Sequence, residues 1–153
     1  MAIETIRITD PGDIVGLIPK IEAYVKVVNN KGVYASAFTT YLMKTVIEGG
    51  DFAQFCVALE DGEPKGFIRF NVLGLPYLSD ICADAIYSWS NNPAITSSLL
   101  DEVVLFAKRH NATRIHSYFY DEAIFKHMQF ILSDKINVVM EDTGAIHGIG
   151  ELK

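Results

Sequence analysis

The segment from Ser90 to Ser97 holds the residues best placed for chemistry in this sequence. It reads Ser-Asn-Asn-Pro-Ala-Ile-Thr-Ser, follows a strand-like apolar run and opens a long amphipathic pattern. A helix that begins here presents free backbone N–H groups and the positive end of its dipole, which together bind anions such as phosphate. The segment contains neither the glycines nor the basic residue that usually surround a phosphate. The same residues suit a capped helix start without a ligand equally well.

Metal binding and nucleophilic catalysis find little support among the other reactive side chains. Neither Cys56 nor Cys82 has a nearby histidine or a nucleophile-elbow motif. Both lie in apolar runs, which favours buried free thiols over a disulfide. No metal site is expected, because three of the histidines are too scattered to form a ligand set: His116, His127 and His147.

The first third of the chain predicts one strand followed by two helices. Residues 3–9 alternate between apolar and polar types, as in a half-buried strand. Apolar positions from Ile14 to Val28 recur at helical spacing, and Pro19 is expected to kink this helix or delay its start. A second amphipathic helix is predicted from Tyr34 to Glu48, where two glycines stop it.

A hairpin and a central strand are predicted next. Residues 52–59 and 66–73 are rich in β-branched and aromatic types, and the Asp61-Gly62 pair between them is typical of a tight turn. Residues 81–89 are apolar on both faces, which indicates a strand in the middle of a sheet.

The longest helix is predicted to begin with Asn92 as its N-cap and Pro93 in its first turn, and to end near His110. The remaining elements are predicted in this order: a strand at 114–120, a short helix at 121–128, one or two closing strands within 131–140 that form a hairpin around Ser133-Asp134, and a loose, glycine-rich tail from Glu141 to Lys153.

This order of elements resembles the GNAT family of acyl-CoA-dependent N-acyltransferases over nearly the whole chain. Residues 55–68 resemble the second and third strands of the family, and residues 97–100, 106–108 and 112–115 are similar to its third helix and fifth strand. Gln129-Phe130 stands where the family usually has a Gly-Phe pair. The resemblance implies a single domain, residues 1–153, with an α/β (α+β) fold: a mixed, mostly antiparallel central sheet flanked by about four helices.

The resemblance also implies a site for acetyl-CoA as a co-substrate. In the family a loop with one basic residue and two glycines holds the pyrophosphate; here Asn91 takes the basic position, and Ala94 and Thr96 take the glycine positions. All three depart from the pattern, which implies that acetyl-CoA binding is weakened or lost. The implied contacts are Ile86, Tyr87 and Ser88 at the end of the central strand, and Asn91, Asn92, Ala94, Ile95, Thr96 and Ser97 at the helix start.

The acid that protonates the departing CoA thiolate in the family is a tyrosine, and the matching position here is Phe125. Tyr118 and Tyr120, at the end of a strand, are the nearest substitutes that the resemblance suggests, although two tyrosines on one strand face are also typical of packing.

The resemblance places a general base on or near the fourth strand. Asp84 or Asp80 fits that position, and Glu122 and His116 are more distant candidates. The alternative for Asp84 is a structural carboxylate at a strand end, bonded to a backbone group.

The function implied is acetyl transfer to a small amine or a peptide amino group, with the acyl-CoA in the splay after the fourth strand and backbone donors near Ile86 to Ser88 polarising the thioester carbonyl. The alternative is a catalytically silent GNAT-like domain that serves as a binding, regulatory or assembly module, which would explain the departures from the motifs together.

Charge and composition limit the expected partners. The 153 residues include 13 basic and 19 acidic side chains, so a net charge of -6 disfavours nucleic acid and anionic membrane surfaces. The sequence predicts no signal peptide and no membrane span, and hence a cytoplasmic protein. A small-molecule amine or peptide is the expected acceptor, and a homodimer is left open.

Overall fold

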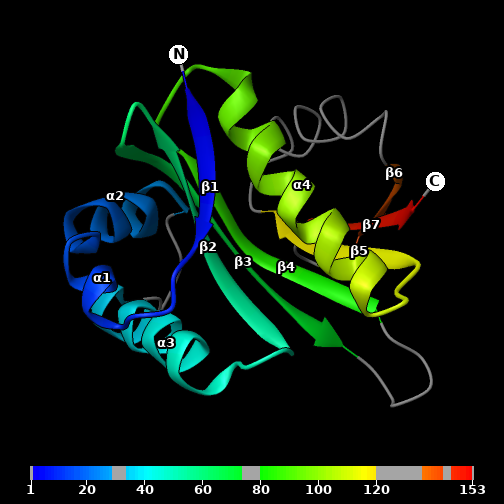
Figure 1. Ribbon diagram of the computed structural model, residues 1–153. Helices are drawn as coiled ribbons and strands as arrows, with labels where there is room; N and C mark the ends of the chain where they lie inside the picture. Colours follow the sequence, from blue (N-terminus) through cyan, green and yellow to red (C-terminus); the bar gives the residue numbers. More distant parts are fainter. Residues whose placement is uncertain (1, 29–33, 74–79, 120–135, 143–145, 153) are drawn as a thin grey trace.

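The computed structural model describes residues 2–28, 34–73, 80–119, 136–142 and 146–152, which form one mixed sheet with helices on both faces (Figure 1). The strand order is β1-β2-β3-β4-β5-β7-β6, and among these described strands β4 and β5 are the only neighbours that run parallel. The expected mixed, mostly antiparallel sheet with four helices is confirmed. The strands are β1 (Ile3–Arg7), β2 (Ala53–Glu60), β3 (Glu63–Leu73), β4 (Asp80–Ser88), β5 (Arg114–Phe119), β6 (Ile136–Asp142) and β7 (Ile146–Leu152).

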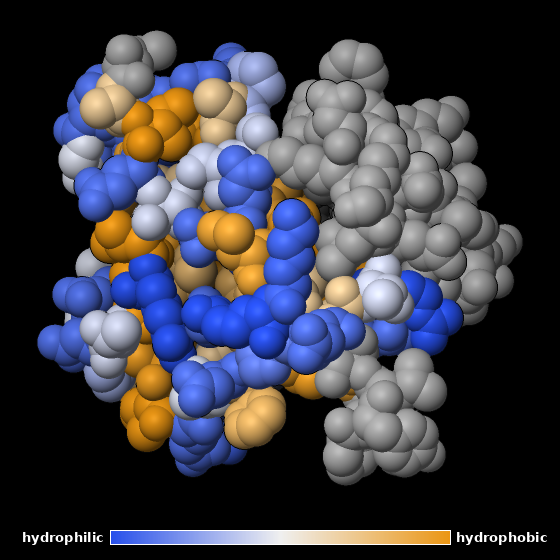
Figure 2. Space-filling view, turned by 45° about the vertical axis from the view of Figure 1, so that its right-hand side comes forward, coloured by the Kyte–Doolittle hydropathy of each residue, from blue (hydrophilic) through white to orange (hydrophobic). Residues whose placement is uncertain are grey.

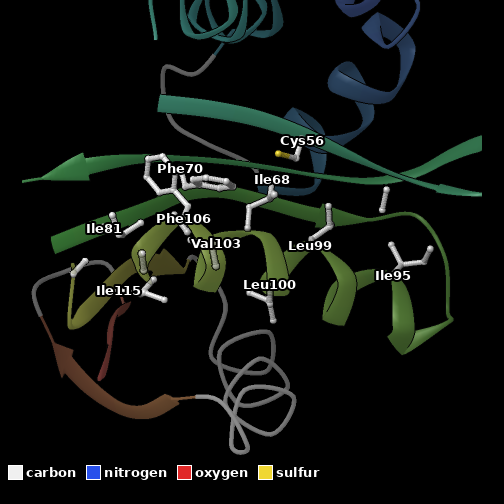
Figure 3. Packing of buried hydrophobic residues seen from close by; sticks show 14 residues of the cluster. Cys56, Ile68, Phe70, Ile81, Ile95, Leu99, Leu100, Val103, Phe106 and Ile115 are labelled. Carbon is white, nitrogen blue, oxygen red and sulfur yellow. The ribbon is translucent and has the colours of Figure 1, made fainter. Parts of the chain in front are cut away.

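The helices of the described residues divide between the two faces of the sheet: α1 (Gly12–Val15), α2 (Ile18–Val28) and α3 (Ala35–Glu48) cover one face, and α4 (Pro93–Arg109) covers the other (Figure 1). Each face has its own hydrophobic core. Figure 3 shows the core beneath α4, where Phe106 packs against Phe70 of β3 with ring centroids 4.8 Å apart. Among the described residues, no helix is both long and apolar enough to cross a lipid bilayer.

A bulge in β4 changes which face its side chains occupy. Phe70 pairs with Ala83 and Arg69 pairs with Ala85, so Asp84 is an extra residue that faces no residue of β3 in the strand register. Because of this insertion, Ala83 packs in the core beneath α4, whereas Ala85 packs in the core beneath α1–α3. Asp84 therefore lies where a bulge re-aims the strand.

The parallel strands β4 and β5 stay together over a short stretch only. They pair at Ile81 with Ile115 and at Cys82 with His116, and the Ser117 hydroxyl then donates to the Ala83 carbonyl over 2.7 Å. Beyond this point β4 continues to Ser88 with β3 as its only strand partner in the described part of the chain. The two strands therefore splay apart from Asp84 onward.

The expectation of a loose C-terminal tail is wrong. Residues 146–152 form β7, which pairs with β5 on one side and with β6 on the other. β6 and β7 form a closing hairpin, whereas the short helix expected at 121–128 and the turn expected at Ser133-Asp134 lie outside the described residues. Glycines at 148 and 150 obscured the strand pattern, yet backbone pairing on both sides holds this segment in the sheet.

Candidate active site

The carboxylate of Asp84 accepts two hydrogen bonds on one oxygen. Arg69 Nη1 donates to Oδ2 over 3.1 Å, and the Tyr41 hydroxyl of α3 donates to the same oxygen. The other oxygen, Oδ1, is buried and has no hydrogen-bond partner among the residues that the structure describes. The bulged residue therefore carries one bound and one free acceptor atom at the start of the splay.

Arg69 ties this carboxylate to two further elements. Only 7% of its surface is exposed, on the face of β3 beneath α3. Its Nε donates to Thr45 Oγ1 over 2.9 Å, and Nη1 also donates to Asn71 Oδ1. A buried guanidinium with these partners is held in one orientation, because its planar fork fixes several donors at once.

Tyr41 contacts both charged partners. The Arg69 guanidinium carbon lies 4.2 Å from the centre of the Tyr41 ring, in the geometry of a cation–π contact. Burial, and then the hydrogen bond to Asp84, raise the pKa of the Tyr41 phenol well above its ordinary value. The phenol is therefore a hydrogen-bond donor at neutral pH and a poor source of protons.

A second ionic cluster lies where β4 and β5 pair. Asp80 Oδ2 is 2.9 Å from both Arg114 Nη2 and His116 Nε2. Burial opposes ionisation of Asp80, but the hydrogen bonds from His116 and Arg114 outweigh it and lower the pKa of this carboxyl. Arg114 Nε also donates to Asp80 Oδ1 over 3.3 Å, so both carboxylate oxygens are engaged. Asp80 lies in the paired part of β4 and not in the splay.

The start of α4 is capped by the chain itself. Asn92 Oδ1 accepts from the Ala94 N–H over 3.0 Å, and Asn92 Nδ2 donates to the Glu60 carboxylate over 2.9 Å. Ile95 N–H bonds back to the Asn92 carbonyl over 3.1 Å. The predicted N-cap is confirmed, and the first free amides of the helix already have acceptors within the protein.

The sequence-predicted contacts divide into exposed and buried residues. Asn91 and Ala94 are exposed, whereas Ile95 and Thr96 are buried. Residues Ile86, Tyr87 and Ser88 occupy the splayed end of β4 and are partly buried, as are Asn92 and Ser97. Backbone groups of the splay and of the helix start therefore remain the candidates for ligand contact, and Ile95 supplies core packing.

Of the two tyrosines proposed as acids, the structure describes only Tyr118. Tyr118 belongs to β5, where its backbone pairs with His147 of β7. Tyr120 lies outside the described residues, as do Phe125 and Glu122. Of the candidate bases, Asp84 and Asp80 lie on the same strand and His116 is bound to Asp80.

Sequence reasoning missed Arg69 and Tyr41. The available signal was a single charge in the apolar strand Phe67-Ile68-Arg69-Phe70, because a strand interior rarely buries an arginine without a partner. Tyr41 had no comparable signal, since its place on a helix face suits ordinary packing.

Solved structures of acetyltransferases share this architecture over nearly the full chain. The PaiA N-acetyltransferase from Thermoplasma acidophilum, solved in complex with coenzyme A, is 15% identical, with a TM-score of 0.68 and 99% of each chain covered. A GNAT-family acetyltransferase from Staphylococcus aureus is 17% identical, with a TM-score of 0.70, covering 99% of this chain and 100% of the other. The YncA protein from Salmonella typhimurium, solved with acetyl-CoA, is 13% identical, with a TM-score of 0.67, covering 100% of this chain and 94% of the other.

No protein-family model matches the sequence, and no curated protein matches it either. The structural likeness, at identities of 13–17%, concerns the path of the backbone. This chain therefore has the fold of the GNAT family of acetyltransferases.

Proposed function

We propose that this protein is an acetyl-CoA-dependent N-acetyltransferase that acts on a small amine or a peptide amino group. The observation that carries the proposal is the splay of β4 from β5, which begins at Asp84. At Ile86–Ser88 the edge of β4 on the β5 side therefore has no strand partner in the described part of the chain, while the other edge pairs with β3. An extended co-substrate fits such an edge by pairing with its backbone groups. Two proteins of the same fold were solved with coenzyme A or acetyl-CoA.

The proposed reaction is direct transfer between the two substrates. The amine nitrogen forms a bond to the acetyl carbonyl carbon, the carbon–sulfur bond breaks, and the thiolate leaves with a proton supplied by water or by Tyr118 or Tyr120. Backbone N–H groups near Ile86–Ser88 stabilise the developing oxyanion. Asp84 accepts the amine proton, because its side chain is 25% exposed and lies where the splay begins.

The start of α4 fits a pyrophosphate less well than a glycine-rich loop does. The Asn92 side chain holds the Ala94 N–H, and the Glu60 carboxylate bonded to Asn92 adds negative charge at the positive end of the helix. A pyrophosphate has to displace or accommodate both groups. We therefore propose weaker co-substrate binding than an uncapped helix start gives.

Calorimetric titration of the purified protein tests this function first. Acetyl-CoA is compared with free CoA and with a longer acyl-CoA, and acceptor amines are then screened with the acyl-CoA that binds. Binding in the micromolar range is the expected result. No heat of binding at millimolar ligand would refute the acetyltransferase proposal while leaving the fold unaffected.

The proposed pyrophosphate position is tested with Ala94→Glu. Ala94 is exposed at the second residue of α4, where a carboxylate stabilises the helix but repels a phosphate. The dissociation constant for acetyl-CoA is expected to rise about tenfold or more. Thr96 is unsuitable for this test because it is buried, so a charge there also disturbs folding.

The matched control is Leu105→Glu, which adds the same charge at a 60% exposed position of the same helix, remote from its start. Equal affinities of the two variants would show that the helix start does not hold the co-substrate.

A second function, a catalytically silent binding or assembly module, is favoured by the Glu60–Asn92–Ala94 chain of hydrogen bonds, which fills the helix start without a ligand. The exposed large hydrophobic side chains give this alternative less support, because several of them, such as Val15, Ile47 and Leu105, lie on three different helices. In Figure 2, hydrophobic and hydrophilic residues are interspersed over the part of the face that is coloured by hydropathy. The titration above decides between the two functions.

A further inference from the structure

The free oxygen of Asp84 marks a place for an additional hydrogen-bond donor. Both described donors, Tyr41 and Arg69, bind Oδ2, and Oδ1 is buried without a donor in the described residues. A buried acceptor that stays unbonded reduces the stability of the folded protein. Buried polar atoms in folded proteins are nearly always bonded, so an exception asks for an explanation.

Arg69 forms hydrogen bonds that packing between β3 and α3 does not require. An apolar side chain between β3 and α3 would avoid the cost of removing a guanidinium from water, and buried ion pairs often stabilise no better than apolar replacements. The guanidinium supplies a direction: it is anchored to Thr45 of α3 and to Asn71 of β3, and from these anchors it reaches Asp84. A carboxylate held by such a fork keeps one orientation.

Tyr41 restrains the same carboxylate from a third element. Its hydroxyl donates to Oδ2, and its ring lies beneath the Arg69 guanidinium. Each of the two residues therefore limits the movement of the other as well as that of Asp84. Groups that support a reacting side chain in this way preorganise it for reaction.

We propose that Arg69 and Tyr41 are positioning residues for Asp84: they hold its carboxylate in one orientation through Oδ2, and in that orientation Asp84 takes the proton of the acceptor amine. This inference rests on the proposed function. It adds two residues that contact neither the amine nor the acetyl group in the proposed reaction, because they act through Asp84.

Tyr41→Phe is the decisive variant, because it removes one hydroxyl and keeps the ring beneath Arg69. The kcat for acetyl transfer is expected to fall about tenfold or more, the factor that loss of a hydrogen bond to a charged group produces. The KM for the amine and the Kd for acetyl-CoA are expected to stay within about twofold, since uniform binding is not altered.

The matched control is Tyr34→Phe, the same chemical change at the N-cap of the same helix, at a residue that is 70% exposed. Equal kcat values for wild type, Tyr41→Phe and Tyr34→Phe would overturn the proposal. A change confined to KM would also overturn it, because positioning of the proton acceptor affects the chemical step.

Arg69→Gln and Arg69→Lys separate positioning from folding. Lysine keeps a cation and a donor but loses the fork, so we expect kcat to recover in part relative to glutamine. Recovery of the melting temperature without recovery of kcat would indicate a structural role only.

A titration of Tyr41 distinguishes failure of this inference from failure of the proposed function. The difference in ultraviolet titration between wild type and Tyr41→Phe reports the Tyr41 phenol alone. Ionisation well above the ordinary value of about 10 is expected, and Asp84→Asn is expected to bring it closer to that value. Ordinary titration in the wild type would mean that the bond to Asp84 does not form. A wild type that binds acetyl-CoA, shows the raised titration and acetylates no amine would instead refute the proposed function, and with it the role of Asp84.

Discussion

Asp84 owes its surroundings to the bulge in β4. In a regular strand without a bulge, Ala83 and Ala85 would lie on one face of the sheet; the bulge moves Ala85 to the face of α1–α3. The same step coincides with the end of β4–β5 pairing. One inserted residue therefore brings a carboxylate, a buried arginine and an open strand edge together.

The two cysteines of the chain illustrate how burial controls reactivity at the residue scale. Both thiols are free, as expected, and burial raises the pKa of Cys56 and of Cys82 to about 12. At pH 8 the thiolate is therefore scarce, and we expect the folded protein to react with a disulfide reagent about a thousandfold more slowly than free cysteine or slower. Absorbance of the released thiol measures the rate. Both groups should react at once in denaturant, and fast reaction of either in the folded state would contradict the assigned burial.

Asp80 is expected to make stability depend on pH. Its pKa is lowered in the folded state, so its contribution to the free energy of unfolding is present above the unfolded pKa of about 3.9 and disappears as the pH falls through the folded pKa. Asp80→Asn is therefore expected to be less stable than wild type at pH 7, with a smaller difference at about pH 3. Urea denaturation at both pH values measures this, with Asp51→Asn, an exposed carboxylate ahead of β2, as the control. A difference independent of pH would show that charge is not the cause.

Close packing of α4 on the sheet depends on one glycine. A Cβ at Gly66 of β3 would lie 2.8 Å from Ile95 Cγ2 and 2.8 Å from the Tyr87 carbonyl oxygen. We expect Gly66→Ala to lower the free energy of unfolding by about 1–3 kcal/mol, as overpacking does. In the control, Gly16→Ala, the nearest atom would be 3.8 Å away and φ is helical, so the effect should be small or favourable. Urea denaturation compares them, and equal stability would mean that α4 can move away without cost.

Elements with local signals were predicted well from the sequence. Asp61 and Gly62 both have positive φ, 51° and 84°, as the tight hairpin requires. Pro19 lies at the second position of α2, where its missing N–H costs little. The helical segment is interrupted just before it, between α1 and α2. Asn92 and Pro93 begin α4 as predicted.

Elements that depend on distant partners were not predictable in the same way. The bulge at Asp84 is defined by β3, and nothing in the local sequence marks it. The tail from Ile146 to Leu152 has no clear alternation, and it becomes a strand because β5 and β6 supply partners on both sides. For the site, Asp84 was proposed from the family resemblance. Arg69 and Tyr41 could be identified only from the structure, because they lie beside Asp84 in the fold and not in the sequence.

At the scale of the whole molecule, the open edge of β4 depends on the C-terminal strands. β5 pairs with β4 at two positions and then with β7 along its full length, from Arg114 to Phe119. The strand that leaves β4 is thus held by β7, and β7 in turn is held by β6. Residues that read as a tail in the sequence therefore maintain the splay on which the proposed function rests.

Because β7 lies inside the sheet, a proline substitution in this strand is expected to destabilise the protein strongly. Ile149 pairs with His116 of β5 and with Val139 of β6, so a proline removes an N–H and inserts a ring between two strands. Ile149→Pro is expected to lower the free energy of unfolding by about 3 kcal/mol or more and to reduce acetyl-CoA binding, because β5 loses its support. Lys153→Pro, one residue beyond the end of β7, should leave both unchanged. Urea denaturation and calorimetry measure the pair, and a stable Ile149→Pro protein would mean that this segment is a dispensable tail after all.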